Sequence, residues 1–200
     1  ENWKNATNGQ SGIGRITCFD TEKFDVKIAG EVKGFDPATV IEKKEIKKMD
    51  RFSQFAQYLG QQAVADSGLD FASNELLRAR TGAIVGVGIG GLQTIENQVE
   101  VYLNKGPDRI TPFFIPLVIT NMAAGHLSIR YGLRGPNYSV TSACASGVHS
   151  IGEAARYIQD GTCDVMLAGG VESAVTPLAI AGFSSMRALS TRNEEPTKAS

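Results

Sequence analysis

Residues 138–170 hold the pattern that most restricts how this chain can fold. The segment "YSVTSA" (138–143) is predicted to form a strand, and a helical pattern follows it until Gly161. The predicted helix carries one apolar stripe, which consists of Val148, Ile151, Ala155 and Ile158. After it, "CDVMLAGG" (163–170) is a continuous apolar run typical of a strand inside a parallel sheet. Two parallel strands joined by a helix make a right-handed βαβ unit, so we predict an α/β fold.

The rest of the chain continues this alternation of helices and strands. The segment "TGAIVGVG" (81–88) is predicted to be a short buried strand that ends in glycines. Further helices are predicted over 43–67, over 92–103, and from Pro116 to about Arg130. Gly106 provides a stop signal after the second of these helices, and residues 1–40 contain mostly turn signals.

Composition narrows the class of protein. The 200 residues and the 42% hydrophobic content suit one globular domain, and the net charge of -1 points to neither nucleic acid nor an anionic membrane as a partner. No run approaches the roughly 18–20 apolar residues of a membrane span, and the first residues lack a secretory signal pattern. Three widely spaced cysteines argue against a disulfide framework or a zinc site. We therefore expect a reducing compartment, either the cytoplasm or, in a eukaryote, an organelle matrix or stroma.

Cys144 lies where the predicted strand 138–143 meets the predicted helix. Ligands of open α/β sheets gather at the carboxyl ends of strands, and this cysteine is at such an end. A helix N-terminus favours negative charge, so it biases a thiol toward the nucleophilic thiolate, and its N–H groups can stabilise an oxyanion. The alternative is a cysteine that merely packs in the core. Cys163 and Cys18 are expected to have only that packing role.

The two histidines are weak candidates for a general base that would serve Cys144. His149 is five residues beyond Cys144, and on a continuous helix this spacing turns its side chain away from the thiol. His126 follows a glycine in another predicted helix and is expected to be a packed or surface residue.

The segment "GVGIGG" (86–91) matches the G-x-G-x-x-G dinucleotide fingerprint. The position about 20 residues further on, where the fingerprint requires an acidic residue after a second strand, is near Asp108 in a predicted loop. The glycines are better explained by a tight turn and close packing. A dinucleotide-binding oxidoreductase remains the alternative from a different class of enzyme.

The segment "TSACASGVHSIGEAARYI" closely resembles the nucleophile segment of the β-ketoacyl-acyl-carrier-protein synthases, which are condensing enzymes of fatty-acid synthesis with the thiolase fold. Further segments fit the same family in order, namely "DSGL", "GIGGL", "PFFIP", "NMAAGHLSIRYGLRGPNYSV", "DVMLAGGVES", "TPLAIAGF" and "RALSTRN". The likeness covers nearly the whole chain and is nearest to the type II synthases. It implies a thiolase-like fold in which residues 1–200 form one partial domain. This domain would be one half of a duplicated, βαβ-containing layered architecture, incomplete at both ends.

The resemblance implies a role for several single residues. Cys144 would be the acylated nucleophile, and its own backbone N–H would supply half of the oxyanion hole. Ile89 matches the residue that closes the acyl pocket, and Phe183 matches an aromatic side chain near the nucleophile. Phe114 matches a residue that lines the pocket from the other subunit of a homodimer. The last three are also residue types that commonly form plain core.

The basic segment "EKKEIKKMDR" (42–51) would place Lys44, Lys47, Lys48 and Arg51 on one face of a continuous helix. Such runs are commonly solvated helix faces, but a concentrated positive patch can also steer an acidic partner. The resemblance favours the second interpretation, because the family docks acidic acyl carrier protein on matching lysines. Further docking positions are matched by Arg109 and Arg187.

The implied reaction is a decarboxylative condensation of an acyl group held on Cys144 with malonyl-acyl-carrier protein, and it requires no metal and no organic cofactor. The family's two decarboxylation histidines, a lysine and a phenylalanine have no match before Ser200, and its first strand has none after residue 1. We therefore expect the 200 residues alone to be inactive. A thiolase or polyketide-type condensing enzyme and a non-catalytic fragment or subunit remain as alternatives.

Overall fold

The structure is a computed structural model, and it describes residues 2–199. The chain divides into two compact units. One unit is Asp36–Ser173, and the other is formed by both ends of the chain, Glu1–Phe35 together with Ala174–Ser200. Each unit is described by itself.

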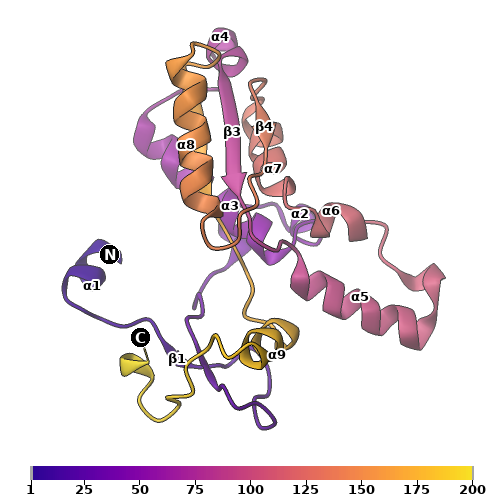
Figure 1. Ribbon diagram of the computed structural model, residues 1–200. Helices are drawn as coiled ribbons and strands as arrows, with labels where there is room; N and C mark the ends of the chain where they lie inside the picture. Colours follow the sequence, from indigo (N-terminus) through magenta and orange to yellow (C-terminus); the bar gives the residue numbers. More distant parts are fainter. Residues whose placement is uncertain (1, 200) are drawn as a thin grey trace. The chain divides into compact units, whose positions relative to one another are not determined.

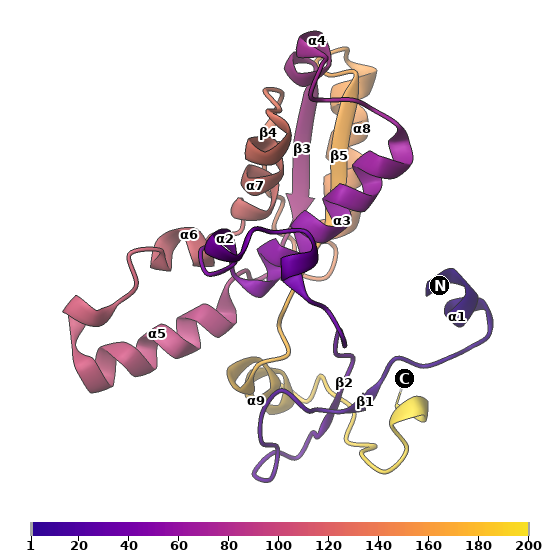
Figure 2. The same ribbon diagram turned by 180° about the vertical axis from the view of Figure 1, so that it is seen from behind.

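The unit Asp36–Ser173 contains a three-stranded parallel sheet, as the sequence predicts (Figures 1 and 2). The central strand β3 (Thr81–Gly86) is buried along its whole length. Strand β4 (Asn137–Tyr138) pairs with one edge of β3, and β5 (Val165–Gly170) pairs with the other edge over six residues. The predicted βαβ unit is therefore present, with β3 between its two strands.

Helices cover both faces of this sheet (Figures 1 and 2). Helices α3 (Arg51–Ser67) and α7 (Met122–Tyr131) pack on each other and on one face, where Phe52, Ala56 and Leu127 join side chains of β3 in the main core. Helix α8 (Ser146–Gln159) packs on β3 and β5 at the other face. The sheet is thus held between two helical layers.

Helix α8 approaches the sheet closely because small residues meet there. The buried positions of α8 are Ser146, Ser150 and Ala154. A Cβ atom placed on Gly86 would lie 2.2 Å from the carbonyl oxygen of Ser146, and one on Gly170 would lie 2.7 Å from the Cα of Gly147. The Ser150 hydroxyl donates toward the carbonyl oxygens of Gly147 and Gly169, so its polar group is satisfied inside this contact. The contact leaves no room for larger side chains.

The apolar stripe predicted for α8 does not face the sheet. Val148, Ile151 and Ile158 are 72%, 55% and 45% exposed, and Ala155 is exposed as well. The small side chains of Ser146, Ser150 and Ala154, which lie on another face of α8, make the close contact instead. Only side chains of this size fit against the glycines of β3 and β5.

The predicted helix over 43–67 is interrupted. Helix α2 covers only Lys43–Ile46, and α3 begins at Arg51 after Asp50. The Asp50 residue is extended and caps α3: one carboxylate oxygen accepts the Phe52 N–H at 3.4 Å, and the other accepts the Thr94 hydroxyl at 2.5 Å. This buried N-cap starts a new helix, so the expectation of one face shared by Lys44, Lys47, Lys48 and Arg51 is wrong.

The predicted helix from Pro116 to Arg130 is also two helices, α6 (Phe114–Val118) and α7. Ile119, after α6, has an extended backbone. The Val118 carbonyl accepts the N–H of Gly91 at 3.1 Å. The turn before α5 is therefore hydrogen-bonded to the last residue of α6. Helix α5 (Leu92–Lys105) and its stop at Gly106 agree with the prediction.

The predicted strand 138–143 pairs with β3 only through β4. Beyond Tyr138 the chain continues beside β3 through hydroxyl groups. Ser139 donates to the Val85 carbonyl at 2.8 Å, and Thr141 donates to the Val87 carbonyl at 3.0 Å. The Val87 N–H still donates to the Val140 carbonyl at 3.2 Å, but the other bonds along this stretch come from side chains, so the strand is shorter than its sequence pattern suggests.

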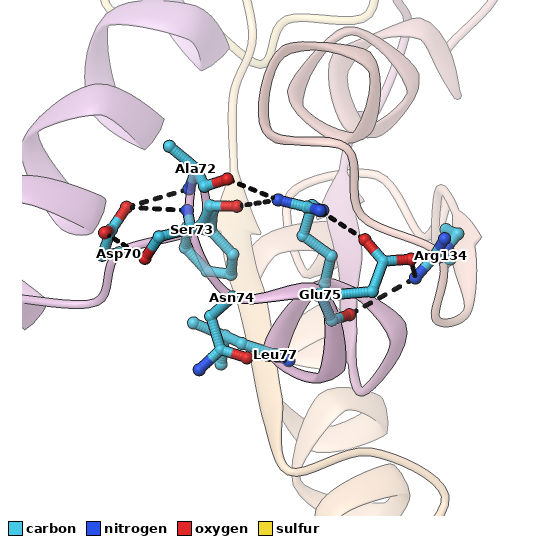
Figure 3. A network of polar contacts seen from close by, with 9 residues as sticks. Asp70, Ala72, Ser73, Asn74, Glu75, Leu77 and Arg134 are labelled. Atoms are coloured by element: carbon cyan, nitrogen blue, oxygen red, sulfur yellow. Dashed lines mark hydrogen bonds and ion pairs between the residues drawn. The ribbon is translucent and has the colours of Figure 1, made fainter.

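Polar contacts fasten the end of the sheet where β3 begins (Figure 3). Asp70 accepts bonds from the backbone of Ala72 and Ser73, and Glu75 in α4 (Glu75–Ala79) pairs with Arg78 and Arg134. Nearby, Arg80 binds Asp164 at 2.7 Å, which ties the start of β3 to the start of β5. The short 3-10 turns η1 (Pro37–Thr39) and η2 (Pro107–Arg109) complete this unit.

The unit formed by the chain ends has its own small core. Strand β1 (Gly14–Arg15) pairs antiparallel with β2 (Ile28–Ala29). The buried side chains are Ile16, Val26, Ile28 and Ile180, the last of them in α9 (Pro177–Ser185). Helix α1 (Asn2–Thr7) and the turn η3 (Pro196–Lys198) belong to the same unit.

The contact between α8 and β3 predicts opposite effects for two glycine-to-alanine substitutions. Gly86→Ala should lower the free energy of unfolding by about 2–3 kcal/mol, because the new methyl group overlaps the Ser146 carbonyl. Gly152→Ala, in α8 with no atom within 4 Å of its Cβ position, should raise it by about 0.5–1 kcal/mol. Urea unfolding followed by circular dichroism measures both values. A Gly86→Ala protein as stable as wild type would contradict the close packing of α8 on β3.

Candidate active site

Cys144 lies in a tight turn at the end of the sheet toward which the strands run, where Gly88 after β3 approaches Ala143, and only Ala145 separates Cys144 from α8. The Ala145 N–H donates to the Ser142 carbonyl at 3.2 Å, and the Ser146 N–H donates to the Ala143 carbonyl at 3.1 Å. Ala143 has a φ of 51°, in the left-handed region that costs a residue other than glycine about 1–2 kcal/mol. Cys144 is exposed. Cys144 therefore precedes a helix as predicted, but the regular strand β4 ends at Tyr138, so a turn rather than a strand comes directly before the cysteine.

The buried Ser146 hydroxyl holds this turn together. It accepts the Ser142 N–H at 2.9 Å and donates to the Ala143 carbonyl at 2.6 Å. The two bonds close the chain on itself across Cys144, and they compensate the strain at Ala143. We call residues 142–146 the nucleophile turn.

The turn between β3 and α5 lies next to the nucleophile turn. A Cβ atom on Gly88 would be 3.2 Å from a carboxylate oxygen of Glu172 and 3.4 Å from the Ala143 carbonyl oxygen. The Glu172 carboxylate accepts the Ile89 N–H at 2.7 Å and the Ser173 N–H at 3.0 Å. Glu172 therefore joins the ends of β3 and β5 beside the nucleophile turn. Glu172 was not predicted as a site residue, because no local sequence pattern marks it.

The three apolar residues of the predicted pocket lie on three different elements. Ile89 is in the turn beside Gly88 and is 39% exposed. Phe114 begins α6, which packs on α5, and it is half-buried. Phe183 lies in α9 of the other unit, so its expected position near Cys144 stays a prediction.

The predicted docking lysines form ion pairs within the chain. Lys44 lies 2.8 Å from Glu42, and Lys48 lies 2.8 Å from Glu45. The bond to Glu42 raises the pKa of Lys44, so this ammonium group stays charged. Lys47 ends α2 as its C-cap, so Lys44, Lys47 and Lys48 occupy one short segment.

The two predicted docking arginines lie elsewhere. Arg109 ends η2, in the same unit as α2. Arg187 follows α9 in the other unit, with a φ of 56°.

The histidines differ from the expectation in one respect. The expectation that His149 points away from Cys144 assumed that both lie on one helix. Cys144 precedes α8, so helical spacing does not give their relative orientation. The imidazole Nδ1 of His149 lies 2.6 Å from the Ser142 hydroxyl oxygen, which brings this ring to the nucleophile turn. His126 is half-buried in α7, where burial lowers its pKa although Glu45 opposes the shift.

The glycines of "GVGIGG" are explained by packing inside the protein. The space above Gly86 is filled by Ser146, and the space above Gly91 is filled by the Leu117 carbonyl, 2.4 Å from a Cβ position. The N–H of Ile89 already binds the Glu172 carboxylate, where a dinucleotide would need donors for its phosphates. Asp108 lies in η2 directly after α5 rather than at the end of a second strand. This geometry argues against a dinucleotide site.

The other two cysteines lie in surroundings that disfavour the thiolate. Partial burial of the thiol and the neighbouring Glu31 carboxylate raise the pKa of Cys18 to about 11, although the residue as a whole is exposed. Burial raises the pKa of Cys163. Cys163 is 2% exposed, as expected for a packing role, whereas the same expectation for Cys18 is wrong because its side chain is exposed. Cys18 donates weakly to the Val175 carbonyl at 3.5 Å.

Two further features bear on the type of site. None of the helices between residues 2 and 199 is long and apolar enough to cross a membrane. Across the part of the chain that the structure describes, no group of three or more His, Cys, Asp or Glu side chains is arranged to hold a metal ion. The groups that the nucleophile turn offers for chemistry include the Cys144 thiol and the N-terminus of α8.

These surroundings predict an order of thiol reactivity. With limiting iodoacetamide at pH 8, Cys144 should be alkylated first, because Cys163 is buried and roughly one thousandth of Cys18 is ionised at three pH units below its pKa of about 11. Peptide mapping by mass spectrometry measures the order. Glu31→Gln is the matched control: without the carboxylate, the pKa of Cys18 should fall and its labelling should accelerate. Labelling of Cys163 or Cys18 before Cys144 would exclude Cys144 as the reactive thiol.

Comparisons with known proteins agree with this architecture. Residues 1–200 match the family "Beta-ketoacyl synthase, N-terminal domain". The chain is 52% identical over 198 residues to the 3-oxoacyl-[acyl-carrier-protein] synthase 2 of Vibrio cholerae, a match that covers 99% of this chain and 47% of that protein. It therefore spans about half the length of the curated relatives that it matches.

Two solved structures have the same fold. A beta-ketoacyl synthase from Burkholderia phymatum superposes with a TM-score of 0.83 and 29% identity, over 98% of this chain and 48% of that one. The complex AntDE:AntF, a type II PKS acyl-carrier protein with its ketosynthase, gives a TM-score of 0.73 and 28% identity over 80% of this chain and 46% of that chain. These neighbours confirm the predicted thiolase-like α/β fold. Together with the match over residues 1–200, they show that the chain belongs to the family of beta-ketoacyl synthase N-terminal domains.

Proposed function

We propose that this chain carries the nucleophile of a 3-oxoacyl-[acyl-carrier-protein] synthase of fatty-acid synthesis, with Cys144 as the acylated residue. The observation that carries the proposal is the exposed Cys144 thiol in the nucleophile turn, at the carboxyl ends of a parallel sheet and directly before α8. The relatives at 46–52% identity are synthases of this name. Because they are about twice as long, the activity is proposed for the protein at the full length of these relatives.

The first half of the proposed reaction is acyl transfer. The Cys144 thiolate attacks the carbonyl carbon of an acyl-carrier-protein thioester, a new carbon–sulfur bond forms, and the bond to the carrier breaks. The carrier leaves as a thiolate that takes up a proton. The N-terminus of α8 favours negative charge at the attacking sulfur, and the backbone N–H of Cys144 is the proposed donor to the developing oxyanion.

The second half forms a carbon–carbon bond. Malonyl-carrier protein loses CO2, and the resulting carbanion attacks the acyl carbon on Cys144. The sulfur leaves as a thiolate, and the product is a 3-oxoacyl chain two carbons longer. Neither His126 in α7 nor His149 beside Ser142 is assigned to the decarboxylation. The family resemblance places that task on histidines without a match in residues 1–200, so these residues alone are expected not to condense.

The proposed partners are acyl carrier protein and a second copy of the chain. The AntDE:AntF complex supports the first, because there a ketosynthase of the same fold binds its acyl-carrier protein. For the second, α5 has no buried residue, and α5, α6 and the residue that follows α6 expose large apolar side chains. These are Val99, Tyr102, Leu103, Ile115 and Ile119. Such exposure is typical of protein interfaces, and Phe114 in α6 is proposed to reach the pocket of the other subunit.

A polyketide-type condensing enzyme is the second candidate, because one solved neighbour is a type II PKS ketosynthase and another is the ishigamide ketosynthase/chain length factor. Their identities of 28–29% are well below the 52% identity to the fatty-acid synthase 2 of Vibrio cholerae, so the first candidate is favoured. The three free cysteines agree with a reducing compartment, and we propose the cytoplasm or an organelle matrix.

Replacing the proposed nucleophile tests the function. In the protein at the full length of its relatives, Cys144→Ala should abolish acyl-enzyme formation and lower the malonyl-dependent formation of 3-oxoacyl product by at least about 10³-fold. Acyl-enzyme is measured by intact mass, and the product by chromatography. Cys18→Ala is the control and should keep wild-type rates. Normal turnover by Cys144→Ala would overturn the proposal.

The lysine segment gives a separate test for carrier-protein docking. Changing Lys44, Lys47 and Lys48 together to Glu should raise the KM for acyl-carrier protein by about tenfold, at the low end of electrostatic steering effects. Acyl transfer from a small thioester should stay within about twofold, because docking does not touch the chemistry. The reverse control, Glu42→Gln with Glu45→Gln, frees Lys44 and Lys48 from their ion pairs and should lower that KM. Equal losses with both substrates would argue against docking at this segment.

A further inference from the structure

Ser142 has all of its polar groups engaged within one stretch of eight residues. Its N–H donates to the Ser146 hydroxyl at 2.9 Å, and its carbonyl accepts the Ala145 N–H at 3.2 Å. Its own hydroxyl oxygen lies 2.6 Å from Nδ1 of His149. The first two bonds lie within the nucleophile turn, and the third joins that turn to the first turn of α8.

The two hydroxyl contacts act on different sides of the turn. Ser146 is buried, and its bonds close the turn from the side of the sheet. His149 is exposed, and its N–H is part of α8 through a 3.0 Å bond to the Ala145 carbonyl. The His149 ring therefore ties the residue two before Cys144 to a helix whose position is set by its packing on β3 and β5.

This arrangement suits a role in orientation rather than in stability. Ala143 lies between Ser142 and Cys144 in a backbone region that is kept only where the surroundings fix it. An exposed imidazole buries little apolar area, so removing it should leave the fold intact while the Ser146 bonds hold. The contact is possible in either tautomer of the ring, because Nδ1 can accept from the hydroxyl or donate to it.

We propose that Ser142 and His149 form a positioning pair that holds the nucleophile turn against α8 and so directs the Cys144 sulfur toward the acyl carbonyl. The inference rests on the proposed role of Cys144. Neither residue of the pair touches the acyl group. Both act through the backbone between Ser142 and Cys144, which sets the angle of attack and the place of the oxyanion relative to the Cys144 N–H.

The test compares two reactions of the same sulfur in the protein at the full length of its relatives. Acylation by acyl-carrier protein in a single turnover needs an aligned attack, whereas alkylation by iodoacetamide needs only an accessible thiolate. Ser142→Ala and His149→Gln should each slow acylation about 5- to 30-fold, within the roughly 10²-fold that a misplacement of 1 Å can cost. Alkylation should change less than about twofold, and the melting temperature should shift by less than about 2 °C.

Two conservative variants are the matched controls. His149→Asn places an amide group where Nδ1 stood, and Ser142→Thr keeps the hydroxyl, so both should acylate within about twofold of wild type. The double variant Ser142→Ala with His149→Gln should be no slower than the slower single variant, because the two residues serve one contact.

The outcomes separate this inference from the proposed function. Wild-type protein that is alkylated at Cys144 but never acylated would refute the proposed function itself. Normal acylation in Ser142→Ala, equal losses of acylation and alkylation, failure of both conservative variants, or multiplied losses in the double variant would each overturn the positioning pair while leaving Cys144 as the nucleophile.

Discussion

The close contact between α8 and the sheet is the constraint on which the site depends. Gly86 at the end of β3 faces the Ser146 carbonyl, and Gly147 faces Gly170 at the end of β5. Since only the small side chains of Ser146, Ser150 and Ala154 are buried at the contact between the helix and these two strands, the first turn of α8 has one position along the sheet. The chain that enters α8 must then reverse direction within the nucleophile turn, and Ala143 adopts a left-handed backbone to do so. Tight packing between backbones thus produces the strain beside the reactive thiol.

The same packing accounts for features that resemble other kinds of site. A glycine-rich turn between a strand and a helix is typical of phosphate binding, but here protein atoms occupy the spaces that the missing side chains leave. The Glu172 carboxylate also binds the Ile89 N–H and places negative charge where a phosphate would lie. The glycine motif therefore indicates that another group approaches the backbone closely, without saying which group. The structure shows that the approaching segments are the nucleophile turn and the end of α6.

Much of the sheet could be predicted from the sequence, because β3 and β5 are uninterrupted apolar runs that end in glycines. Cys144 could be singled out as well, because the sequence pattern changes from strand to helix at this residue. The breaks at Asp50 and at Ile119 were missed, since each depends on a partner distant in sequence, Thr94 in one case and the Gly91 N–H in the other. Glu172 was missed for the same reason, because its partner Ile89 is distant in sequence. Ser142, Ser146 and His149 contact one another within eight residues, and they were missed because a strand rather than a tight turn was expected before α8. Ser146 carries a local signal as the first residue of α8, whereas Glu172 becomes visible only when β3 and β5 lie side by side.

The two turns at the carboxyl ends of the strands are therefore parts of one assembly. The turn that carries Ile89 is held by Glu172, and Gly88 beside it lies against both that carboxylate and the Ala143 carbonyl. A displacement of Ile89 must move Gly88 or break the bond to Glu172, and a displacement of Gly88 presses on the strained residue before Cys144. If Ile89 closes the acyl pocket, as the family resemblance implies, filling that pocket and orienting the thiol are mechanically linked through Gly88, where only glycine fits without forcing a neighbour to shift. The linkage needs no additional moving domain, because it arises from contacts between two turns on the same rigid sheet.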